Sequence, residues 1–107
     1  MASTCSIEIS PTAFRTLKAI RDRKVQNEIR RAIDGLARGP ETQGKSLFKP
    51  LEDVRSIRAV LSRYRILYRV DGAKELVSIV LIGERRSGRE EDVYSVARKL
   101  VNLLLGG

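Results

Sequence analysis

Apolar residues recur along this chain at two spacings, which predict strands in some segments and helices in others. Residues 5–9 alternate between apolar and polar side chains, so they predict a short strand with one apolar face. Ser10 and Pro11 predict the start of a helix, because serine caps helix N-termini and proline suits the first helical position. The apolar positions of this helix are Phe14, Leu17 and Ile20.

A second helix is predicted over residues 25–38, after the polar segment 22–24 interrupts the first. Gly39 and Pro40 end it. Two helices joined by a short link form a helical hairpin, and the outer face of this one is rich in lysine and arginine. The predicted apolar stripe of the second helix is Val25, Ile29, Ile33 and Leu36, with Ala32 beside it.

Strand patterns follow a polar loop. Segments 55–61 and 64–70 alternate between apolar and polar side chains. Segment 76–82 is almost continuously apolar, as expected of an inner strand that is covered on both faces. Segment 46–51 contains Pro50, which predicts a strand at the edge of the sheet because proline cannot donate to the hydrogen-bond ladder.

Asp71-Gly72 predicts a tight hairpin turn between two of these strands. A last helix is predicted from Glu90 onward, because carboxylates in a first helical turn favour the helix dipole. The order of elements predicts an α+β fold in one domain, residues 1–107. In this fold an N-terminal strand and helical hairpin pack on a mainly antiparallel sheet of four to five strands, and a C-terminal helix follows.

Charge points to the kind of partner. Lysine and arginine number 21 and aspartate and glutamate 13, for a formal net charge of +8. Such an excess indicates a polyanion or an acidic protein as partner, because net charge governs steering and nonspecific association. A basic surface that serves only solubility is the alternative.

The chain has one cysteine and no histidine. Cys5 cannot form an internal disulfide, which fits a reducing cytoplasmic compartment. Without histidine we expect no zinc site, and any catalysis has to proceed without an imidazole. We also expect no other metal and no cofactor. No segment resembles a bilayer span or a signal peptide, so we expect no membrane partner.

Arginines gather on one predicted sheet face. Alternation places Arg58, Arg65 and Arg69 opposite the apolar side chains of their strands. If the strands are neighbours, Arg58 and Arg65 share a face, with the loop that holds Arg85 at one end. Strand arginines usually form only a solvated face, but like charges held close together need a counter-ion. Tyrosines on the apolar side are expected in the core, and these are Tyr64 and Tyr68.

The motifs occur in an ordered set. Residues 55–71 contain R-S-I-R followed by Y-R-I-L-Y-R-V-D, and residues 82–94 contain I-G-E-R followed by D-V-Y. With the helical hairpin and the connection 39–51, this set resembles the RelE/ParE toxins of type II toxin–antitoxin systems. The resemblance covers nearly the whole chain. It implies their fold and a cognate acidic antitoxin as partner.

The resemblance implies two different activities. RelE-like toxins cleave mRNA in the A site of the 30S ribosomal subunit, whereas ParE-like toxins inhibit DNA gyrase and are not nucleases. We predict the RelE-like activity, a ribosome-dependent mRNA interferase, with gyrase inhibition as the alternative. A third possibility is a non-catalytic RNA-binding protein whose arginines only contact phosphates.

The resemblance to RelE-like toxins assigns candidate site residues position by position. Arg58, Arg65, Arg85 and Tyr94 match positions of the RelE-like active surface. The best-known members commonly have a second basic residue two positions before Arg58, where this chain has Ser56, and the loop from Arg85 to Tyr94 is longer here. These departures leave the acid–base assignment open. The further predicted RNA-binding residues are Lys49, Arg55, Arg69, Arg86 and Arg89.

RNA cleavage is chemically reasonable without histidine. The 2′-hydroxyl of RNA attacks the adjacent phosphorus in line, and the enzyme orients the backbone, neutralises charge and moves two protons. Arginine matches phosphate geometry but is a poor base, because its pKa exceeds about 12. Tyr94 and Lys49 are therefore the candidates for proton transfer.

Overall fold

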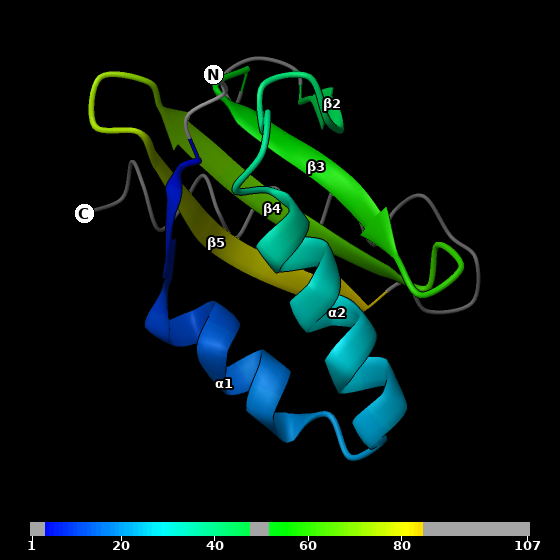
Figure 1. Ribbon diagram of the computed structural model, residues 1–107. Coiled ribbons are helices and arrows are strands. Elements are labelled where there is room, and N and C mark those ends of the chain that lie inside the picture. Colours follow the sequence, from blue (N-terminus) through cyan, green and yellow to red (C-terminus); the bar gives the residue numbers. More distant parts are fainter. Residues whose placement is uncertain (1–3, 48–51, 85–107) are drawn as a thin grey trace, which may run out of the picture.

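The computed structural model describes residues 4–47 and 52–84. Its elements follow the predicted order of strand, two helices and four strands (Figure 1). They are β1 (Ser6–Ile9), α1 (Pro11–Ala19), α2 (Arg23–Gly35), β2 (Lys45–Ser46), β3 (Val54–Ala59), β4 (Tyr64–Asp71) and β5 (Leu76–Glu84). The predicted C-terminal helix lies outside the described residues.

The strands form one five-stranded sheet in the order β1-β5-β4-β3-β2. β1 pairs with β5 in parallel, and the other pairs are antiparallel. The α+β prediction is therefore confirmed, with β5 as an inner strand. β2 lies at an edge but is described only as Lys45–Ser46, and residues 48–51 of the predicted edge strand 46–51 lie outside the described residues. Both helices lie against one face of the sheet (Figure 1). Neither of these two helices is long and apolar enough to cross a membrane.

Side-chain caps start both helices. Ser10 accepts a hydrogen bond from the backbone N–H of Ala13 at 3.1 Å, as predicted for the start of α1. Asp22 accepts from the backbone N–H of Lys24 at 2.9 Å and caps α2. The polar segment 22–24 is thus the start of the second helix, because a carboxylate satisfies N–H groups that have no partner within the helix.

One apolar residue of α1, Phe14, does not lie on the buried face of the helix. Phe14 is 45% exposed, whereas Ala13 and Leu17 are buried and face the sheet. The Lys18 ammonium lies 5.4 Å from the centroid of the Phe14 ring, a cation–π contact that shields the exposed ring. In α2 the predicted stripe is confirmed, although the helix ends at Gly35 rather than Arg38.

The main core lies between the helices and the sheet. Tyr64 and Tyr68 are 6% and 0% exposed on this side, which confirms their prediction as core residues. A second, smaller cluster of Val54, Leu67 and Leu81 is buried on the opposite side. A β-bulge in the β4–β5 pair brings Val80 to the same cluster as its neighbour Leu81. β5 is apolar almost throughout because it contributes side chains to both clusters.

Both hairpin turns differ from their predictions. The strand predicted to reach Leu61 ends at Ala59, and Leu61 lies fully exposed at the tip of the β3–β4 hairpin. In the β4–β5 turn the left-handed residue is Glu75, with φ of 51°, and not the glycine of Asp71-Gly72. Asp71 instead accepts a hydrogen bond from the Lys74 backbone N–H at 3.1 Å, so its carboxylate organises a longer turn.

The β3–β4 tip holds three consecutive non-glycine residues in the left-handed region, Val60, Leu61 and Ser62. Left-handed backbone costs an L-residue about 1–2 kcal/mol. The Leu61 side chain makes little compensating contact because it is fully exposed.

We predict that Leu61→Gly raises the free energy of unfolding by about 1 kcal/mol, because glycine adopts this backbone without strain. Urea denaturation measures the change. The control is Ala73→Gly, an exposed turn position outside the left-handed region, which should lose about 0.5–1 kcal/mol through entropy alone. Equal destabilisation in both variants would contradict the strained tip.

Candidate functional site

Arg58 of β3 and Arg65 of β4 are direct cross-strand partners. Such partners hold their Cβ atoms about 4.5–5.5 Å apart, so the two arginine side chains leave the sheet from neighbouring positions on the same face. Arg58 is exposed and Arg65 is partly buried. Arg69 lies on the same side by alternation. This side of the sheet, opposite α1 and α2, is called the arginine face below.

A cavity of about 480 Å³ opens beside the arginine pair. Ser56, two residues before Arg58, lines the cavity and is only 7% exposed. Its Oγ has no hydrogen-bond partner among the described residues. No carboxylate is among the described residues that line this cavity, so its lining attracts anions. The lining residues are Gly44, Lys45, Leu47, Ser56, Ile57, Arg58 and Arg65.

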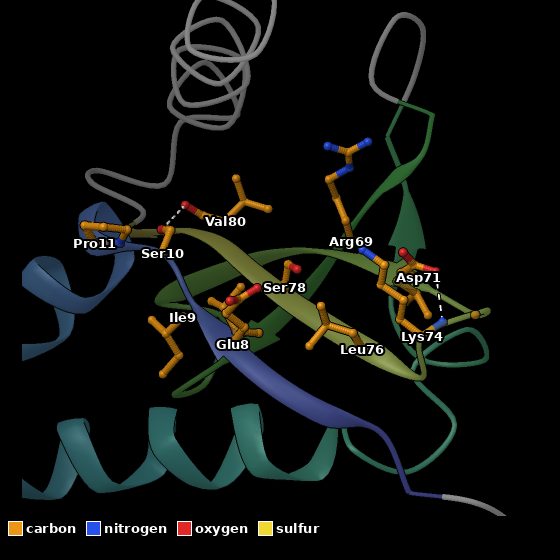
Figure 2. Close-up of a pocket in the computed structure, with 13 residues that line it drawn as sticks. Glu8, Ile9, Ser10, Pro11, Arg69, Asp71, Lys74, Leu76, Ser78 and Val80 are labelled. Carbon is orange, nitrogen blue, oxygen red and sulfur yellow. Dashed lines mark hydrogen bonds between the residues drawn. The ribbon is translucent and has the colours of Figure 1, made fainter.

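Arg69 has a different environment from the arginine pair. Its Nη2 lies 2.6 Å from Oδ2 of Asp53, in an ion pair whose side chains are both about half exposed. It also lines a separate cavity of about 760 Å³ over β1, β5 and the end of β4 (Figure 2). A carboxylate partner lowers the positive charge that Arg69 offers to an anion.

The larger cavity mixes both signs of charge. Figure 2 shows Glu8 from β1 and Asp71 from β4 around the same space as Arg69 and Lys74. A phosphate backbone would meet repulsive carboxylates there, whereas the smaller cavity offers it cations and a hydroxyl. The smaller cavity at the arginine pair is therefore the better candidate site.

Arg55 lies on the other side of β3, away from the arginine pair. Its Nε and Nη2 donate to the backbone carbonyls of Gln43 and Gly44, each at 3.0 Å. The Tyr68 hydroxyl lies 2.8 Å from the carbonyl oxygens of Pro40 and Gln43 and donates to either one. Arg55 is thus committed to holding the loop before β2.

The described tyrosines are poor bases. Burial, together with a 2.8 Å hydrogen bond to Glu84, raises the pKa of Tyr64. Burial also raises the pKa of Tyr68, although the nearby Arg55 guanidinium acts in the opposite direction. Both phenols therefore stay protonated at neutral pH and act as hydrogen-bond donors.

The structure brings together only part of the predicted site. Arg58 and Arg65 share a cavity, Arg69 lies in the neighbouring one, and Arg55 lies on the other face. Lys45 lines the cavity of the arginine pair and was not predicted, because its place depends on how β2 is aligned with β3. The predicted residues outside the described part of the chain are Lys49, Arg85, Arg86, Arg89 and Tyr94.

Comparison with protein families identifies the chain. Residues 7–88 match the family model described as the ParE toxin of the type II toxin–antitoxin system parDE. The match covers most of the sequence, so the chain belongs to this family of the RelE/ParE superfamily. It is a toxin of a type II toxin–antitoxin system. Among curated proteins, no sequence matches this chain.

Solved structures of both branches resemble it. The RelBE2 complex of Mycobacterium tuberculosis includes a chain with TM-score 0.64 and 29% identity, over 77% of this chain and 92% of that one. The isolated RelE toxin of E. coli gives 0.66 and 22%, over 91% and 98%. The ParDE system of P. aeruginosa gives 0.63 and 17%, over 78% and 98%. The last two identities show a shared fold alone.

The loop before β2 packs tightly against β3 at Gly44. Gly44 has a φ of +66°, and an added Cβ would lie 2.5 Å from the Ser56 carbonyl oxygen. We predict that Gly44→Ala lowers the free energy of unfolding by about 2 kcal/mol or more, from left-handed strain and the clash together.

Urea denaturation tests this expectation against Gly35→Ala as a control. A Cβ at Gly35, the last residue of α2, meets no atom within 4 Å. Gly35→Ala should be neutral or stabilise by up to about 1 kcal/mol. A Gly44→Ala variant as stable as the parent would mean that the loop does not pack on β3 in this way.

Proposed function

We propose that this toxin is a ribosome-dependent mRNA interferase that acts in the cytoplasm on mRNA in the A site of the 30S subunit. The proposal depends chiefly on one observation, the pairing of Arg58 with Arg65 across β3 and β4. Guanidinium groups match phosphate oxygens bidentately, and two of them side by side suit a charge-rich phosphate transition state. The adjoining cavity offers room for the RNA backbone.

The proposed reaction uses the 2′-hydroxyl of the RNA as nucleophile. Its oxygen forms a bond to the adjacent phosphorus while the bond from phosphorus to the 5′-oxygen breaks. Arg58 and Arg65, joined by Arg85, stabilise the negative charge that builds on the non-bridging oxygens. The 2′-hydroxyl proton passes to a base and the leaving 5′-oxygen takes a proton from an acid, with Tyr94 and Lys49 as the candidates.

Inhibition of DNA gyrase without nuclease activity is the second candidate. The matching family model carries the ParE description, and the ParDE system of P. aeruginosa shares the fold. Ser56, where a basic residue is common in the best-known RNA-cleaving toxins, also favours this alternative. In that case the arginine face would contact protein rather than RNA.

We also propose an acidic antitoxin segment as partner of the arginine face. Several of the similar solved structures are toxin–antitoxin complexes, including the RelBE complex of E. coli. The net charge of +8 supplies long-range attraction to an acidic chain.

We predict that Arg58→Ala and Arg65→Ala each slow mRNA cleavage in a translation extract by about 10²- to 10³-fold, the effect of losing one preorganised donor to a developing negative charge. The control is Arg31→Ala, which removes the same charge from the exposed side of α2. Circular dichroism checks that all three variants stay folded.

Two assays run side by side separate the candidate functions. Mapped breaks in ribosome-bound mRNA that depend on Arg58 and Arg65 support the interferase. Intact mRNA together with blocked gyrase supercoiling would reject the interferase and establish the alternative.

A further inference from the structure

Lys45 lies beside the arginine pair although it comes from a different strand. It is the direct cross-strand partner of Ser56 in the β2–β3 pair. Direct partners on antiparallel strands share a face, so Lys45 and Ser56 lie next to each other on the arginine face. Both residues line the cavity that also contains Arg58 and Arg65.

The Ser56 hydroxyl is the second observation that points to a ligand. The residue is 93% buried by its 7% exposure, and its Oγ has no hydrogen-bond partner among the described residues. A buried hydroxyl without a partner is unfavourable, because it has given up the hydrogen bonds of water. An anionic oxygen in the cavity would accept a hydrogen bond from the Ser56 hydroxyl and remove this penalty.

The loop before β2 fixes Lys45 at this place. Gly44 approaches the Ser56 carbonyl so closely that no Cβ fits between them. Arg55 holds the carbonyls of Gln43 and Gly44 from the other face of β3. Arg55 is therefore a positioning residue that acts through the loop.

We propose that Lys45 and Ser56 form a second phosphate subsite, which holds the backbone phosphate next to the one at Arg58 and Arg65. An ammonium and a hydroxyl donor suit a phosphate oxygen, and no carboxylate among the described lining residues competes for them. The ligand of this subsite is single-stranded RNA, an identity that rests on the proposed function. In this subsite Lys45 on β2 supplies a cation close to Ser56, where β3 itself has none.

The test is binding of a short 2′-O-methyl oligoribonucleotide to the full chain, followed by fluorescence anisotropy over a range of salt concentrations. This probe has no free 2′-hydroxyl, so it binds without being cleaved. Lys45→Met should weaken binding about tenfold and reduce the slope of log K against log salt by about 0.7, the value for one phosphate contact on a single strand. Lys45→Arg should keep both, and Ser56→Ala should weaken binding with the slope unchanged.

Lys24→Met is the matched control, because Lys24 is an exposed lysine on α2 in the other layer. Equal effects of Lys45→Met and Lys24→Met would overturn the subsite, as would a wild-type chain that does not bind the probe. The extract assay separates this from the proposed function. Lys45-dependent binding without mRNA breaks leaves the subsite standing and rejects the interferase. If the wild type breaks mRNA normally and Lys45→Met binds the probe as tightly as the wild type, the interferase stands and the subsite is rejected.

Discussion

Two arginines held opposite each other across β3 and β4 are the constraint on which the site depends. Like charges on directly opposed positions destabilise a sheet, so the pair needs a register that cannot relax. The packing of the core fixes this register. A slip of one residue would turn Tyr64 and Tyr68, 6% and 0% exposed, away from the helices. The energy of the helix-covered core thus keeps Arg58 and Arg65 together on the opposite face.

The cationic side chains near the sheet contact different partners. Arg55 bonds to backbone carbonyls and holds a loop, and Arg69 pairs with Asp53. Arg58 and Lys45 line a cavity whose described residues include no carboxylate. A high net charge therefore does not make every arginine a ligand contact. The partners within the fold decide which cations remain available to an anion.

The sequence predicted much of the fold because its signals are local. Alternation along β3 and β4 placed Arg58 and Arg65 on one face, and the cap at Ser10 marked the start of α1. Non-local geometry was missed. The position of Lys45 depends on the β2–β3 register, which the close approach of Gly44 sets.

Other errors have the same origin. Leu61 continues the alternating pattern of its strand, yet the chain turns at Ala59 and leaves Leu61 in solvent. Phe14 has helical spacing, but the smaller Ala13 faces the sheet. Periodicity tells which residues share a face, whereas the packing distance between layers decides which of them are buried.

The central claim is that the sheet holds two guanidinium groups in place for an anion. Thermal unfolding of the wild type and Arg58→Met, in chloride and in phosphate at equal ionic strength, tests it most directly. In chloride the variant should be at least as stable as the wild type, because one repelling charge is gone. Phosphate should raise the Tm of the wild type more than that of the variant, since ligand binding to the folded state adds stability. An equal rise in both proteins would mean that phosphate acts only as a general stabilising salt, and it would contradict the account.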